Sequence, residues 1–125
     1  MTQAQRKQLE RRLLSERERL VDALARYGRE TRDSEERSRA GDLSAYPTHM
    51  ADEGTDAITQ EVDAANAARQ SEELHEIDEA LERLYRDPEH FGRCSVDGRQ
   101  IAFARLQLMP WARTCQVHAP ESARL

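Results

Sequence analysis

The sequence of 125 residues is poor in aromatic side chains, has only two cysteines and contains no long apolar run. Six aromatic side chains are too few to fill a broad globular core, whereas long helices need only a narrow apolar stripe. No stretch approaches the roughly 20 apolar residues of a membrane-spanning helix. The first ten residues lack the apolar segment of a signal peptide. We therefore expect a soluble, cytoplasmic protein with no membrane partner.

The net charge of −5 is unevenly distributed along the chain. Residues 1–40 hold eleven basic and eight acidic side chains, residues 41–90 hold three and fourteen, and residues 91–125 hold five and two. If the first two segments form a helical hairpin, each lies beside a partner of opposite charge, although single exposed ion pairs contribute little. The acidic middle argues against direct DNA binding, which needs a basic surface for phosphates. The acidic middle suits a basic protein surface or a metal-bearing site better.

Two long segments have the apolar spacing of amphipathic helices. Residues 3–38 contain no proline, and their leucines recur at spacings near three and four, which predicts a first helix. Gly41, Pro47 and Gly54 interrupt the pattern, which predicts a loop or hairpin tip at 40–55. A second helix is predicted at about 56–86, and Asp87-Pro88 ends it.

The second helix carries two apolar stripes. The longer one is regular and consists of Leu74, Ile77, Leu81 and Leu84. Ile58, Val62 and Ala65 form the other in a different phase, which indicates a coiled-coil stutter or a change of contact face near the tip. The sequence thus predicts a mainly α fold, a long antiparallel coiled-coil hairpin over residues 1–88.

Residues 89–119, here called the knob, concentrate Phe91, Phe103 and Trp111 in a small apolar cluster, and residues 120–125 form a tail. A unit of this size usually needs a metal, a disulfide or a docked partner for stability. The two cysteines belong to a frame of the form C-x2-D-x17-C-x2-H, made by Cys94, Asp97, Cys115 and His118. Paired short knuckles of this spacing are typical of a zinc ribbon, in which aspartate is a less usual ligand.

The knob and the preceding helix resemble the TraR/DksA family of bacterial transcription regulators. The resemblance rests on FGRC at 91–94, on Ile101 to Leu106, on Pro110 and on the closing Cys115, and it extends through ELHEIDEALERLY to the tip HMADEGTD. It covers roughly residues 45–118. It implies a coiled-coil hairpin with a zinc-finger-like, ribbon-like knob.

The resemblance also implies a function. Members of this family insert their hairpin into the secondary channel of RNA polymerase, where acidic tip residues act near the active site, and some respond to guanosine tetraphosphate. The tip pattern of the best-known branch is D-x-x-D-x-A. Here the aligned residues are His49, Asp52 and Gly54, so only Asp52 matches, and Asp56 lies nearby. No feature of the sequence supports a nucleotide response.

Several alternatives stay open at this point. The knob can bind zinc, can have lost zinc and be held by its apolar cluster, or can form a Cys94–Cys115 disulfide, which a reducing cytoplasm disfavours. Asp52 and Asp56 can act on the polymerase or simply cap the second helix. The leading function is a polymerase-binding regulator, and the alternative is a helical-hairpin adaptor that has lost zinc and regulation. No nucleophile arrangement, phosphate loop or cofactor fingerprint predicts an enzyme.

Overall fold

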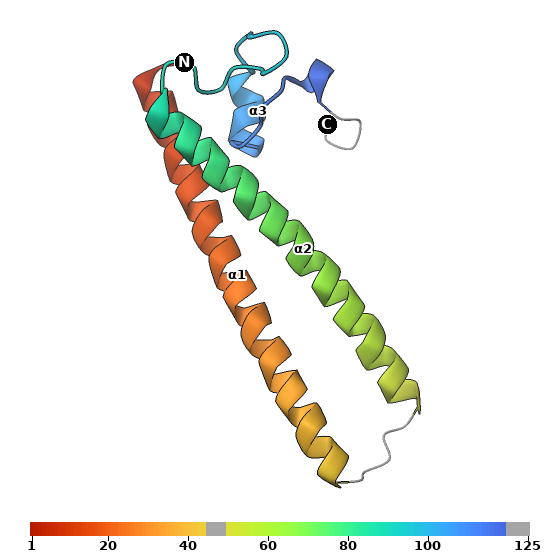
Figure 1. Cartoon of the computed structure of the whole chain (residues 1–125). Helices are drawn as coiled ribbons and strands as arrows, with labels where there is room; N and C mark the ends of the chain where they lie inside the picture. Colours follow the sequence, from red (N-terminus) through yellow and green to blue (C-terminus); the bar gives the residue numbers. More distant parts are fainter. Residues whose placement is uncertain (45–49, 120–125) are drawn as a thin grey trace. The chain divides into compact units, whose positions relative to one another are not determined.

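The computed structural model describes the backbone of residues 1–44 and 50–119, and the side chains of residues 1–33, 35, 36 and 57–119. Its elements are α1 (Gln3–Ser44), α2 (Met50–Arg86), α3 (Phe103–Leu108) and the short 3-10 helix η1 (Gln116–His118). Within these described residues there is no strand, only an isolated antiparallel bridge between Arg93 and Gln100. Helices α1 and α2 form a long helical hairpin (Figure 1). The expectation of a mainly α hairpin is confirmed.

Both long helices extend further toward the tip than the spacing predicted. Helix α1 continues to Ser44 rather than ending near residue 38, and α2 begins at Met50 rather than near residue 56. Gly41 and Gly54 therefore lie in helix. A glycine in a helix interior lowers helix stability by about 1 kcal/mol relative to alanine. The many other turns of each long helix outweigh this cost. At its other end α2 stops at Arg86, directly before Asp87 and Pro88.

Helix α1 starts at a reciprocal pair of side-chain hydrogen bonds. The backbone N–H of Gln5 donates to Thr2 Oγ1 at 3.1 Å, and the backbone N–H of Thr2 donates to Gln5 Oε1 at 2.9 Å. This is a capping box, which satisfies N–H groups that have no partner within the helix.

The chain divides into two compact units, of which the first contains Met1–Glu18 and Leu74–Leu125. Its core joins the start of α1, the end of α2 and the knob. The side chains that are at most 7% exposed in this unit include Leu9, Leu13, Ile77, Leu81, Leu84, Phe91, Ile101 and Leu106. Each fully buried leucine or isoleucine contributes about 1.5–3 kcal/mol of hydrophobic free energy. The knob therefore shares one apolar core with the base of the hairpin.

The second unit, Arg19–Glu73, has a much thinner core. Leu20 is fully buried and Ala67 is 9% exposed, whereas Ile58 and Val62 are 64% and 53% exposed. The second apolar stripe of the sequence thus faces solvent in this unit. Ala67, which belongs to neither predicted stripe, is the buried position among the described side chains 57–73 of α2.

No helix in the described part of the chain is long and apolar enough to cross a membrane.

Candidate metal centre

The first knuckle is a tight turn that presents Cys94 and Asp97 on the same side. The N–H of Gly98 donates to the carbonyl of Cys94 at 2.9 Å, and the N–H of Cys94 donates to the carbonyl of Arg99 at 2.8 Å. Gly98 has φ +73°, a left-handed conformation that residues with a side chain rarely adopt. Asp-Gly at 97–98 is therefore a turn, as its sequence suggests, and Asp97 also faces the second knuckle.

The two carboxylate oxygens of Asp97 contact different groups. Oδ1 accepts a hydrogen bond from the N–H of Arg99 at 3.0 Å, which fixes the side chain against its own turn. Oδ2 lies 3.5 Å from Nδ1 of His118. Because Oδ1 is held by the backbone, Oδ2 is oriented toward the second knuckle.

The second knuckle is the short helix η1 and the residue before it. The N–H of His118 donates to the carbonyl of Cys115 at 3.1 Å, which turns both side chains the same way. The two knuckles are joined by the backbone, since the N–H of Ser95 donates to the carbonyl of Arg113 at 2.8 Å. The residue after Cys94 is thereby joined to the segment that leads into Cys115.

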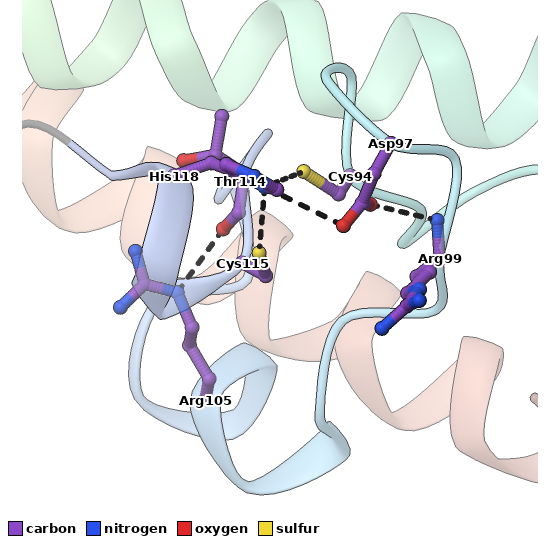
Figure 2. Close-up of polar contacts among 7 residues, drawn as sticks. All are labelled: Cys94, Asp97, Arg99, Arg105, Thr114, Cys115 and His118. Atoms are coloured by element: carbon purple, nitrogen blue, oxygen red, sulfur yellow. Dashed lines mark hydrogen bonds and ion pairs between the residues drawn. The ribbon is translucent and has the colours of Figure 1, made fainter.

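Nδ1 of His118 is the centre of the cluster (Figure 2). It lies 3.1 Å from Sγ of Cys115 and 3.5 Å from Sγ of Cys94. One donor atom from each of Cys94, Asp97, Cys115 and His118 lies within 4.8 Å of the other three, and the group could hold a metal ion. The structure thus brings together all four residues of the C-x2-D-x17-C-x2-H frame. Both cysteines are free thiols.

The donor set fits a tetrahedral zinc ion in both chemistry and spacing. For zinc bonds of about 2.0–2.3 Å to N, O and S, neighbouring ligand atoms of a tetrahedron lie about 3.3–3.8 Å apart. The three separations at Nδ1 of His118, 3.1, 3.5 and 3.5 Å, are close to this range. The hydrogen bond from Arg99 to Asp97 is the kind of outer-shell contact that orients a metal ligand.

The electrostatics of the cluster favour the ionised donors that a metal needs. Burial of Cys94 opposes ionisation, but hydrogen bonds from the backbone of Cys115, Asp97 and Val96 and from the His118 side chain outweigh it, and the pKa of Cys94 falls to about 7. The pKa of Asp97 is lowered mainly by the backbone hydrogen bond from Arg99. Thiolate and carboxylate are the forms that bind metals.

Two arginines support the cluster from outside, and the sequence offered a signal only for Arg105, which lies in the Ile101 to Leu106 segment of the family resemblance. Arg105 in α3 is only 7% exposed, and its Nε donates to the carbonyl of Thr114 at 3.2 Å, directly before Cys115 (Figure 2). Arg113 pairs with Glu76 and Glu79 of α2. Among many arginines and acids, nothing in the spacing singles out these pairs.

The predicted tip residues lie mostly beyond what the structure describes. His49 is outside the described residues. Asp52, Gly54 and Asp56 belong to the first turns of α2 by their backbone, and their side chains are outside the description. Helix α2 begins at Met50, earlier than predicted, so Asp52 lies in its first turn rather than before it, and whether its carboxylate caps the helix stays a prediction. The action of these tip residues on a polymerase stays a prediction.

The architecture matches a solved bacterial transcription factor. The structure of DksA2 from Pseudomonas aeruginosa matches this chain with a TM-score of 0.70 and 30% sequence identity, over 92% of this chain and 80% of that one. An uncharacterised protein of Bacillus subtilis, YteA, is 35% identical over 74 residues, which are 59% of this chain and 30% of YteA. The chain thus spans less than a third of the length of YteA. No protein-family model matches the chain.

Proposed function

This chain belongs to the DksA family of transcription factors, and from that premise we propose that it regulates transcription by binding bacterial RNA polymerase. The hairpin enters the secondary channel of the enzyme and its tip acts near the active site. The observation that carries this proposal is the match to DksA2, because it extends over the hairpin and the knob together. A role of this kind is exerted in the cytoplasm.

The charge of the hairpin is suited to such a partner. Residues 41–90 carry fourteen acidic and three basic side chains, a net charge of −11. An acidic segment is attracted to basic protein surfaces and repelled by nucleic acid, so that complementary potentials favour docking to protein rather than to DNA. The chain therefore acts on the polymerase and does not bind promoter DNA itself.

Binding to purified RNA polymerase core enzyme tests this proposal. We expect saturable binding of the full chain at physiological salt, and weaker binding as salt is raised. Reversal of an exposed charge on the hairpin, Glu61→Lys, should weaken binding about fivefold if the acidic charge of α2 contributes to docking. The matched reversal Glu89→Lys lies beyond the end of α2 and should leave affinity unchanged. Absence of binding at physiological salt would support the adaptor alternative instead.

We further propose that Cys94, Asp97, Cys115 and His118 hold one structural zinc ion. Zinc would supply a fixed cross-link between the two knuckles in a knob whose apolar core is small. Metal analysis of protein purified without added zinc should find one zinc ion per chain, and none in Cys115→Ser. A folded wild-type knob with no zinc would overturn the proposal and leave the apolar cluster as its only support.

A further inference from the structure

A pocket of about 330 Å³ lies within the first unit, between the last turn of α2 and the knob. Its walls include Arg83 and Arg86 from α2, and Arg93 and Arg113 from the knob. Phe91 and Ala112, both buried, contribute an apolar part of the lining. The pocket is separate from the four-residue metal cluster, none of whose side chains lines it.

Two of the four arginines form ion pairs with carboxylates of α2. Arg86 pairs with Glu82 one turn earlier, and Arg113 pairs with Glu76 and Glu79. The carboxylate in the pocket wall, Asp87, is itself bonded by Nδ1 of His90 at 2.7 Å.

The guanidinium groups of the other two arginines, Arg83 and Arg93, make no close hydrogen bond or ion pair among the described residues, although Glu76 attracts Arg83 and Asp87 attracts Arg93. Arg83 is half-buried, and this burial lowers its pKa against the opposing attraction of Glu76. A guanidinium that has lost part of its hydration without gaining a close acceptor gains from an incoming anion.

We propose that this pocket binds the phosphate group of a small phosphomonoester whose apolar part lies against Phe91 and Ala112. Two guanidinium groups, one from α2 and one from the knob, suit a doubly charged phosphate, since each can donate two parallel hydrogen bonds. The volume is within the range of small-molecule sites and exceeds the needs of a bare phosphate ion. The apolar lining therefore calls for a ligand with an apolar or planar body.

A titration of the isotope-labelled full chain, followed by the backbone amide signals, tests this proposal with phenyl phosphate as the probe. We expect saturable shifts at Gly92, Arg93 and Ser95, which line the pocket. Inorganic phosphate lacks the apolar part and phenol lacks the charge, so each should bind at least about tenfold more weakly. No saturable shift at these amides up to about 10 mM phenyl phosphate would overturn the proposal. Equal affinity for inorganic phosphate would overturn the role of the apolar lining.

Variants separate the pocket from general charge attraction. Arg93→Gln removes an exposed guanidinium from the rim, and Arg83→Gln removes the half-buried one. Each should weaken phenyl phosphate about tenfold, as expected for the loss of a charge-assisted hydrogen bond. Arg12→Gln, on the exposed face of α1, removes the same charge away from the pocket and should have no effect. If Arg12→Gln weakens binding as much as Arg93→Gln, attraction is non-specific and the proposed site is wrong. Thermal unfolding of Arg93→Gln should match the wild type, so a loss of binding there reports on the site.

Discussion

Nε of Arg113 in the knob lies 3.4 Å from Oε2 of Glu76 in α2. The same guanidinium also pairs with Glu79, and the carbonyl of Arg113 accepts the N–H of Ser95 beside Cys94. One residue thus connects the second helix of the hairpin, the first knuckle and the segment that leads into the second knuckle. The knob is attached to the base of the hairpin by this polar contact as well as by the shared apolar core.

The contact predicts a measurable coupling between knob and helix. Arg113→Gln should lower the free energy of unfolding by about 1 kcal/mol, because its ion pairs are partly exposed and individually weak. A double-mutant cycle with Glu76→Gln should give a coupling energy of about 0.5 kcal/mol, measured by denaturant unfolding. Additive effects of the two substitutions would show that the pair contributes nothing to the docking of the knob.

The lowered pKa of Cys94 predicts how the metal-free protein responds to pH. A thiol whose pKa is about 7 when folded and 9.0 otherwise favours the folded state in its ionised form. Its contribution is complete above pH 9, and it is lost as the pH falls through 7. The unfolding free energy of the chelator-treated chain should therefore rise with pH across this window. In Cys94→Ser this rise should be absent, and an unchanged rise would assign it to another group.

Asp97 offers a test that separates a metal ligand from a turn residue. In Asp97→Asn the side-chain oxygen can still accept the N–H of Arg99, so the turn is kept while the anionic donor is lost. We expect zinc affinity to fall at least about tenfold, measured by competition with a chromophoric chelator. Asp97→Cys supplies a thiolate and should bind zinc more tightly than the wild type. Equal zinc affinity of Asp97→Asn and the wild type would restrict Asp97 to the turn.

We expect that loss of the Asp52 carboxylate at the tip affects regulation of transcription but not affinity for RNA polymerase. Asp52→Asn should leave affinity for RNA polymerase within about twofold, because the rest of the hairpin provides the docking surface. It should abolish the effect of the chain on transcription from a responsive promoter in vitro, where the carboxylate acts near the active site. Glu53→Gln removes the same charge from the neighbouring position and is the matched control. If both variants regulate like the wild type, the tip carboxylate has no part in the mechanism.

Regular spacing made the hairpin core and the metal cluster predictable. The leucines at 9 and 13 and the stripe from Ile77 to Leu84 are buried as their periods indicate, because an amphipathic helix has one apolar face. Two knuckles of equal spacing predicted that Asp97 and His118 would meet. Thr2-x-x-Gln5 is a visible capping-box pattern that could have been found in the same way.

What could not be predicted depends on contacts between distant parts of the chain. In α2 the helix face that carries Ala67 is buried, and the face that carries Ile58 and Val62 is exposed. The spacing of the apolar residues did not show which of the two faces would be buried. The ion pairs of Arg113 with Glu76 and Glu79 could not be predicted, because the sequence contains many other arginines and acids that could have paired. The guanidinium groups of Arg83 and Arg93 line one pocket, which exists only once the knob has folded against α2.

The most direct test of the polymerase proposal is site-specific crosslinking from the tip. A photo-crosslinking amino acid placed at His49, in the predicted tip, should attach to polymerase segments beside the catalytic centre when the full chain is bound. The same label at Glu89, beyond the end of α2, should attach only at the outer rim of the channel. Crosslinks from residue 49 to the outer surface of the polymerase, or none at all under conditions of saturated binding, would contradict the account.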